Sequence, residues 1–398
     1  MKLNRPKQIL LFLRSFTVNI KKSIFFIILL ICTISAAFSF DWGAELSNTA
    51  NACQPQNLEA DDAAKFSLWV KTPLDYSHNT WFTAEGFFKT QFFYPDLIFD
   101  FTTDITLLKL SMTIKLNEMI FGRFEMGRLQ FADASSLVMA QSADGFKFEW
   151  DSPYVNAELF GGFTGLINAR TNPIYLAFDD TTARFYSLSS PFMLTGVNFI
   201  FPQLLTGKTL TVESYGAFNT SGTLAHRLYA AAAISGNLSP NSYYLLSSTF
   251  GWTMSSDAGF SKPSNLSQAE LAIYKGKTSV TASAIYASAE NGTLSDFIPF
   301  STIYADIISN RIYSGTIKAN MIATLRFTRG FLGSVSGSAF FTLPKENVTE
   351  GYSGAQWTAA LKFQAASDLQ FTISGGQYYG TDAESNYTFA SINFILNL

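Results

Sequence analysis

The chain has 398 residues, of which 27 are basic and 30 acidic, so its formal charge at pH 7 is −3. A net negative charge does not attract a polyanion, so nucleic acid is not an expected partner. Charged residues make up only 14% of the chain, against about 25% in ordinary soluble domains, while aromatic residues reach 16% and the mean hydropathy is +0.14.

Residues 1–39 have the pattern of a secretory signal peptide. Six basic residues come before or beside an apolar run that starts after Ser23, and Ala37-Phe38-Ser39 satisfies the small-x-small rule, so we expect cleavage after Ser39. A membrane anchor is the alternative, but the run is short of the ~20 residues that a spanning helix needs. Without the leader, 21 basic and 30 acidic residues remain, a formal charge of −9. No later apolar run approaches spanning length, so membrane helices are not expected.

After the leader, apolar residues recur at every second position in short segments. The first is 40–48, and the polar segment 49–63 that follows is predicted to be an outer link that could fold inward. Such alternation marks strands with two different environments. In 98–107, one face is predicted to hold Phe99, Phe101, Ile105 and Leu107, and the other Asp100, Thr102, Asp104 and Thr106.

The most distinctive segment is 121–150. It contains Gly127-Arg128 near a strand end, Asp133 in the link, and Asp144-Gly145 at the start of the return strand. This arrangement resembles the hairpin of substrate-selective bacterial porins and alginate-export-type barrels. The resemblance implies passive transport of small polar or sugar-like solutes, with Arg128 and Asp133 near the pore mouth. The residues alone leave open a structural hairpin in which Arg128 only neutralises an acid.

The next strand ends with glycines at 161, 162 and 165 and enters the longest link, 165–191. Glycine permits the strained backbone of an inward turn. Rings of charged side chains set pore selectivity, so a constriction is predicted here. Its candidates are Arg170, Asp179, Asp180 and Arg184. A solvated surface loop is the alternative.

An activated nucleophile or water would need a histidine, and only His78 and His226 are present. His78 lies in a predicted turn, and His226 at a strand end has no acid nearby in sequence. No Gly-x-Ser-x-Gly, Walker or dinucleotide motif occurs. We therefore expect neither an enzyme nor a metal or cofactor site.

Alternation returns in 317–328 and 356–365. By phase, charged side chains of both signs share one face, which is forbidden in an apolar core unless they are paired but ordinary in a watery lumen. The predicted lumen charges are Glu85, Lys89, Asp100, Asp104, Arg123, Glu125, Lys147, Glu149, Glu158, Glu213, Glu270, Lys318, Arg326 and Lys362. Of these, the candidates for lining the pore, beside Arg128, Asp133, Asp144 and those of the long link, are Arg123, Lys318, Arg326 and Lys362.

The last nine residues alternate to the final position, with one apolar face made of Ala390, Ile392, Phe394, Leu396 and Leu398. This segment resembles the C-terminal signal strand of bacterial outer-membrane β-barrels, although that family commonly ends in Phe. The resemblance implies an outer-membrane location, contact with lipid, and recognition of 387–398 by the barrel-insertion machinery. An ordinary core strand is the alternative.

If Leu398 is periplasmic, long outer links should alternate with short periplasmic turns. The outer links are predicted near 49–63, 95–96, 129–143, 165–191, 220–224, 254–264, 291–314, 344–352 and 380–386. The turns are predicted near 73–79, 117–119, 152–153, 203–207, 237–240, 276–277, 329–330 and 366–368. Counting predicts an all-β fold, a transmembrane antiparallel β-barrel of roughly 16–18 strands over residues 40–398, closed by pairing of the last strand with 40–48. A soluble antiparallel sandwich is the competing fold.

The sequence thus predicts an outer-membrane, porin-like channel for passive diffusion of small hydrophilic solutes. Two alternatives stay open. One is a plugged barrel whose links 165–191 and 291–314 bind surface partners. The other is a fatty-acid-type transporter of hydrophobic substrates, which would need an N-terminal plug.

Overall fold

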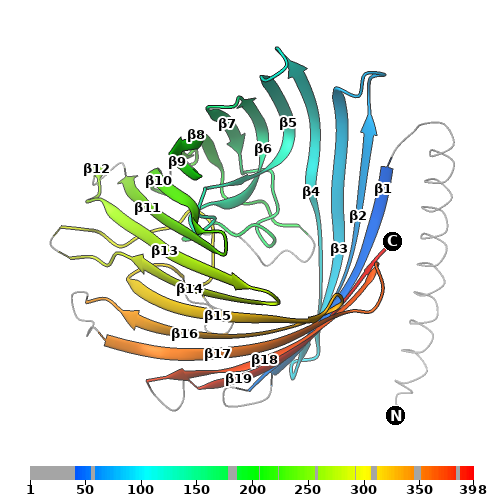
Figure 1. Cartoon of the computed structure of the whole chain (residues 1–398), viewed down its shortest axis with the longest axis vertical. Coiled ribbons are helices and arrows are strands. Elements are labelled where there is room, and N and C mark those ends of the chain that lie inside the picture. The colour runs from blue at the N-terminus through cyan, green and yellow to red at the C-terminus, as the bar shows by residue number, and fades with distance from the viewer. Residues whose placement is uncertain are drawn as a thin grey trace, which may run out of the picture.

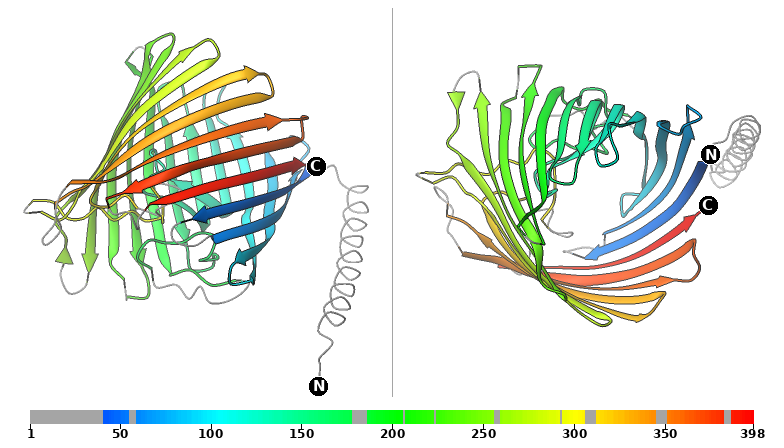
Figure 2. Two further views of the ribbon diagram at one scale, coloured as in Figure 1. Left: turned by 90° about the horizontal axis from the view of Figure 1, so that it is seen from below. Right: turned by 45° about the horizontal axis from the view of Figure 1, so that its top comes forward.

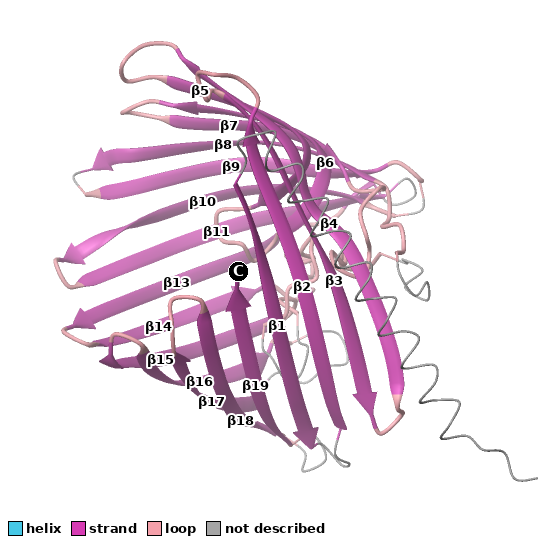
Figure 3. Ribbon diagram, turned by 90° about the vertical axis from the view of Figure 1, so that its right-hand side faces the viewer, coloured by secondary structure: helices cyan, strands magenta, loops and turns pink. Residues whose placement is uncertain are grey.

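The computed structural model describes residues 41–54, 59–177, 186–205, 207–222, 224–255, 259–291, 293–305, 312–344, 351–381 and 386–398. The predicted leader, 1–39, lies outside the described residues. Figure 3 shows that the regular elements of the described residues are β-strands. No helix of the described part is long and apolar enough to cross a membrane.

The strands follow one another around a single antiparallel sheet. In chain order they are β1 (Asp41–Gln54), β2 (Glu59–Pro73), β3 (Thr80–Tyr94), β4 (Ile98–Lys115), β5 (Phe121–Ala132), β6 (Ala140–Asp151), β7 (Asn156–Phe163), β8 (Phe192–Leu205), β9 (Lys208–Asn219), β10 (His226–Ser239), β11 (Ser242–Ser255), β12 (Gly259–Phe260), β13 (Ser264–Lys275), β14 (Thr278–Ala287), β15 (Thr316–Thr328), β16 (Phe331–Thr342), β17 (Gly351–Gln364), β18 (Leu369–Gly380) and β19 (Tyr387–Asn397). The two-residue β12 pairs only with the end of β11, so eighteen of the described strands form the wall.

The ring is closed by the last strand. β19 pairs with β1 from Glu45 opposite Asn397 to Gln54 opposite Thr388, and in Figure 2 the red β19 lies beside the blue β1. The predicted pairing of the terminal strand with the first one is confirmed, as are the all-β barrel and its strand number. Closure removes the unpaired edges that an open sheet would leave at its first and last strands.

Alternation separates the two faces of the wall. Leu46 on β1 lies opposite Leu396, and Ala50 lies opposite Ile392, on the apolar outer face. The alternate residues of β1, such as Glu45 and Asn51, share the inner face with the ion pair Lys109–Glu125. The predicted apolar stripe of the last strand is therefore part of the outer surface.

Most links have the predicted lengths. The turns 276–277 and 329–330 separate β13 from β14 and β15 from β16, and the links 164–191 and 288–315 are the long ones. The prediction for 49–63 is wrong, because β1 continues to Gln54 and β2 begins at Glu59. The small polar residues of this stretch satisfy one another across the strands, as when Asn51 Nδ2 donates to Asp61 at 3.1 Å.

One predicted face is also wrong. Glu85 lies opposite Leu107 while Gly86 lies opposite Ile105, so Thr106 is the extra residue of a β-bulge. A one-residue insertion moves all following side chains to the other face. Leu107 therefore lies on the inner face, where the simple alternation had placed Thr106.

Candidate functional site

The hairpin formed by β5 and β6 leaves the wall before its strands end. β4 and β5 pair only up to Leu108 opposite Arg128, and β6 and β7 only up to Asp144 opposite Phe163. Beyond these points 129–132 and 140–143 pair only with each other. In Figure 1, β4 and β5 run together at one end and separate toward the other. Leu129 and Phe131 are fully buried in the core inside the ring, so the hairpin folds into the lumen.

Two glycines lie where the hairpin departs. Gly127 has φ 119°, and a Cβ there would lie 2.1 Å from the carbonyl oxygen of Leu108. At Gly145, a Cβ would lie 2.0 Å from the carbonyl oxygen of Gly161. A side chain larger than hydrogen fits at neither position, which explains why both dipeptides, Gly127-Arg128 and Asp144-Gly145, contain glycine.

The tip of the hairpin is shaped by Asp133. Its Oδ1 accepts the backbone N–H of Val138 and Met139 at 3.0 and 2.7 Å, and its Oδ2 accepts the N–H of Ser135 at 3.0 Å. The next N–H, that of Ala134, donates to the buried carboxylate of Glu213 on β9 at 3.0 Å. Asp133 thus fixes the shape of the tip, and Glu213 holds the tip against the inner wall. The predicted place of Asp133 at a pore mouth stays a prediction.

Departure of the hairpin leaves one edge of β4 without a strand. Along 98–107 that edge is met by side chains instead. The carbonyl oxygens of Phe101, Thr103 and Ile105 accept hydrogen bonds from Arg170 Nη1 (3.3 Å), Asn168 Nδ2 (3.1 Å) and Arg128 Nη1 (3.2 Å), respectively. We call this edge, with Arg128, Asn168 and Arg170, the seam. Asn168 and Arg170 belong to the link between β7 and β8, so this link supplies hydrogen-bond donors to the edge of β4 that has no neighbouring strand.

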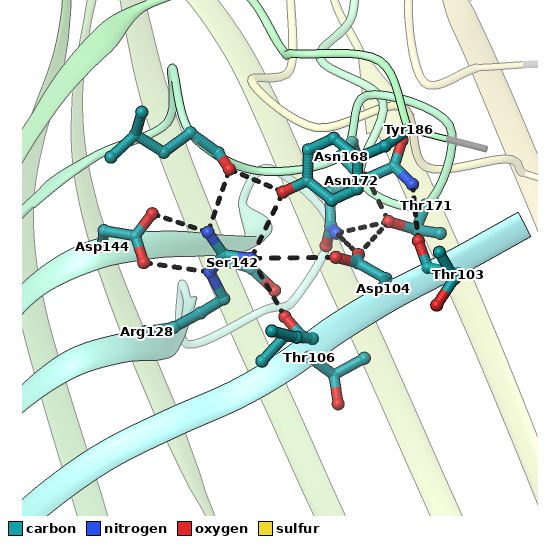
Figure 4. A network of polar contacts seen from close by, with 12 residues as sticks. Thr103, Asp104, Thr106, Arg128, Ser142, Asp144, Asn168, Thr171, Asn172 and Tyr186 are labelled. Atoms are coloured by element: carbon teal, nitrogen blue, oxygen red, sulfur yellow. Dashed lines mark hydrogen bonds and ion pairs between the residues drawn. The ribbon is translucent and has the colours of Figure 1, made fainter. Parts of the chain in front are cut away.

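Arg128 is the centre of the seam (Figure 4). Its Nε and Nη2 donate to the two carboxylate oxygens of Asp144, both at 2.9 Å, and Nη2 also donates to the carbonyl oxygen of Leu166 at 2.9 Å. Asp104 Oδ1 lies 3.8 Å from Nη1, while Asp104 Oδ2 accepts the hydroxyl of Thr171. One guanidinium therefore neutralises two largely buried carboxylates.

Arg170 forms a second ion pair across the seam, donating to both carboxylate oxygens of Asp100. The structure thus brings Arg128, Asp144 and Arg170 together, and leaves Asp133 apart at the hairpin tip. Asp179, Asp180 and Arg184, the other predicted constriction residues, lie outside the described residues.

Part of the long link 288–315 also lies inside the ring, with Phe297 and Phe300 fully buried. The N–H groups of Phe300 and Ser301 both donate to the carbonyl oxygen of Val138 in the hairpin, at 2.8 and 3.0 Å. The N–H of Tyr175, in the other long link, donates to the carbonyl oxygen of Phe300 at 2.9 Å. Hairpin and long links therefore pack as one body in the lumen.

Arg227 on β10 ties this body to the wall. Its Nη1 donates to the carbonyl oxygens of Pro299 (2.9 Å) and Phe300 (3.3 Å), and its Nη2 to that of Tyr175. Sequence reasoning did not select Arg227. The one feature of the sequence that could have identified it is a cation at the start of a strand, at the end of the barrel where the long outer links are predicted.

Other lumen charges form a row on β4–β7. Lys109 pairs with Glu125 (2.6 Å), Arg123 with Glu149 (3.1 Å), and Lys147 with Glu149 (2.7 Å) and Glu158 (3.7 Å). Because each ammonium or guanidinium lies beside a carboxylate, this part of the wall has little net charge.

The remaining candidates come from β15 and β17. Lys318 Nζ donates to the carbonyl oxygen of Ala305 in the link 288–315. Arg326 and Lys362 flank Leu332 in one row of the inner face. Both are exposed, and within the part of the chain that the structure describes neither side chain has an ion pair or a hydrogen bond.

The histidines have structural neighbours. His78 lies in the turn 74–79 with its ring 5.5 Å from that of Trp81, and His226 Nδ1 accepts the N–H of Asn219 at 3.0 Å. Among the described residues, no three His, Cys, Asp or Glu side chains are grouped to hold a metal ion.

Comparison with known proteins gives a match in structure only. No protein-family model matches the sequence, and no curated protein is similar to it. Among solved structures, the chain is similar to the outer membrane protein OpdK of Pseudomonas aeruginosa, with a TM-score of 0.65 at 11% identity over 90% of this chain and 98% of that one. OccK2 (OpdF) of the same organism, solved in complex with glucuronate, gives 0.65 at 10% identity with the same coverage. OccAB2 of Acinetobacter baumannii gives 0.60 at 11%, again over 90% and 98%. The chain has the closed β-barrel fold of these proteins.

Proposed function

We propose that this protein is a porin-like channel of a bacterial outer membrane, through which small hydrophilic solutes diffuse passively. The observation that carries the proposal is a closed wall of eighteen strands with an apolar outer face and charged side chains on its inner face. A barrel of this size is too wide for its wall side chains to fill, and a polar interior suits an aqueous path. The likeness to an outer membrane protein supports the same reading.

We assign the narrowing of this path to the hairpin tip and the two long links. Arg123, Arg326 and Lys362, whose side chains are open to the lumen, would line the remaining space. Arg128, Asp144 and Arg170 would act indirectly, because the seam already uses their charges.

The direct test is conduction by the purified protein in planar lipid bilayers. Discrete, ohmic current steps are expected, together with swelling of protein-containing liposomes in small sugars. A folded barrel that shows neither would overturn the channel.

Reversing two charges should change ion preference. The double variant Arg326→Glu, Lys362→Glu turns the cations without described partners into anions, so cation permeability should rise relative to anion permeability. The reversal potential in a salt gradient measures this, with the charge-conserving Arg326→Lys, Lys362→Arg as the control. An unchanged reversal potential would remove both residues from the conducting path.

Loosening the inner body should widen the path. Arg227→Met leaves the carbonyl oxygens of Pro299 and Tyr175 without the donor described for them, at a cost of about 1–3 kcal/mol for each one that stays buried, and leaves that of Phe300 with the N–H of Tyr175 alone. The links should then detach, raising single-channel conductance and current noise. Lys275→Met, which removes an exposed cation beside the turn 276–277, is the control. Equal conductance in both variants would show that Arg227 does not hold the constriction.

A second candidate is a barrel blocked by its own links, acting as a structural or surface-interaction protein. Full burial of Val138, Phe297 and Phe300 inside the ring favours it. Silence of the natural protein with conduction by the Arg227→Met variant would support this candidate. The fatty-acid-type alternative has less support, since the stretch considered for an inward plug belongs largely to β1 and β2.

Delivery to the membrane is part of the same proposal. Residues 1–39 would act as the export leader, and 387–398 as the segment that the insertion machinery recognises. That strand closes the barrel against β1, so a variant lacking it should neither close nor insert.

A further inference from the structure

Three aromatic side chains share the inner face of β2 and β3. Trp69 lies opposite Gly43 on β1 and Glu85 on β3, in the same phase as the inward-facing Lys65 and Lys71. Trp81 and Phe87 follow the same phase on β3 as Glu85. Side chains at every second position lie on one face, so the three rings and the lysines form one stretch of the lumen wall.

Two of the three rings already have a cation above them. Lys71 Nζ lies 4.5 Å from the ring centroid of Trp81, and Lys65 Nζ lies 4.6 Å from that of Phe87. Trp81 is also fixed by donation from Nε1 to the carbonyl oxygen of His78 at 2.8 Å. Trp69 is different. It is 40% exposed, and no ring, cation or hydrogen-bond partner of its side chain occurs among the described residues.

The position of Trp69 depends on Gly43. A Cβ at residue 43 would lie 2.6–2.8 Å from the indole atoms Nε1, Cε2 and Cζ2, so the ring lies against the β1 backbone at a place that only glycine leaves free. An indole gains free energy when its surface leaves water. The exposed Trp42 lies on the outer face with Leu46, where lipid covers such rings, but Trp69 lies on the water-facing side.

The flanking groups suggest what would cover it. Glu85 lies directly across from Trp69, and Lys71 and Glu45 lie two positions along the inner face of their strands from Trp69 and Gly43. An aromatic face beside carboxylate acceptors and an ammonium donor suits a ring with apolar C–H faces and a rim of hydroxyls. The two carboxylates disfavour an anionic ring.

We propose that Trp69, with Glu85 and Lys71, forms a weak binding site for the pyranose ring of a neutral sugar inside the lumen. The inference rests on the proposed channel function and names the class of solute that the lumen retains. Stacking on one fixed indole would slow passage of such a solute without blocking it.

The test uses the mature protein in planar bilayers with maltose as the probe and glucuronate as its acidic counterpart. Maltose should interrupt the current, and Trp69→Ala should raise the half-blocking concentration about tenfold, equivalent to about 1.4 kcal/mol. Trp69→Phe should retain most of the block, and Trp42→Ala on the outer face should leave it unchanged. Glucuronate should block less than maltose.

An open channel that maltose does not block, or a block that survives Trp69→Ala, overturns the site. Stronger block by glucuronate overturns the choice of a neutral sugar. If the barrel conducts no current, the channel function fails by itself. Saturation-transfer NMR of maltose with the detergent-solubilised protein then tests the site separately: transfer lost in Trp69→Ala supports it, and transfer that is absent or unchanged overturns it.

Discussion

Replacing Gly145 by alanine is expected to destabilise the barrel by about 3 kcal/mol or more. The new Cβ would lie 2.0 Å from the carbonyl oxygen of Gly161 and 2.5 Å from the Cα of Gly162. These are backbone atoms of β7, so no flexible side chain can move aside, and β6 and β7 must separate where the hairpin turns inward. Urea unfolding in detergent, followed by the loss of heat-modifiable migration in gels, measures the effect.

Gly337→Ala is the matched control. Gly337 lies in the interior of β16, and a Cβ there would meet nothing within 4 Å. Its replacement should change stability by less than about 0.5 kcal/mol. If Gly145→Ala were as stable as Gly337→Ala, the close approach of β6 and β7 would not constrain the fold.

Arg128→Met should have the second large effect, a loss of about 3–5 kcal/mol. The substitution keeps an unbranched apolar stem but leaves Asp144 without its bidentate partner, Asp104 without its nearest cation, and the carbonyl oxygen of Ile105 without this donor. The carbonyl oxygen of Leu166 keeps only the hydroxyl of Tyr186. The seam should open locally before the whole barrel unfolds. Protease cleavage within the link between β7 and β8 should therefore increase more than global unfolding does.

Two further variants separate the ion pair from general damage. Arg326→Met, which removes a lumen cation without a described partner, should leave stability nearly unchanged. Adding Asp144→Asn to Arg128→Met should restore part of the loss, because it removes one unpaired buried charge. Equal stability of the single and double variants would show that the ion pair does not control the seam.

The architecture was largely predictable from sequence. Period-two alternation, as in 317–328, and the stripe ending at Leu398 are local properties of a strand between lipid and water. They predicted the strand type, the closing pair with β1, and the places of most links. The wrong predictions fall where the pairing between strands, rather than the local hydrophobic pattern, decides the structure. The stretch 49–63 looked like a loop because it is polar, and Leu107 changed face because a bulge at Thr106 cannot be read from alternation.

The site was predictable only in part. The residues Gly127-Arg128 and Asp144-Gly145 were selected as a hairpin, and they do lie opposite one another. The sequence does not reveal that β5 separates from β4, and β6 from β7, beyond these residues. Because of that separation, Arg128 becomes the central residue of the seam. Arg227 and the buried Glu213 were not selected as site residues, because their partners are carbonyl and N–H groups of links distant in the chain.

By itself, the sequence determined that this protein is an all-β barrel with an apolar outside and a charged inside, since the face of each side chain follows from its position along one strand. Only the tertiary structure decided which strands leave the wall, how Asn168 and Arg170 close the gap, and which lumen charges stay open. Those outcomes depend on contacts between segments far apart in the chain, where backbone groups that lose one partner must find another.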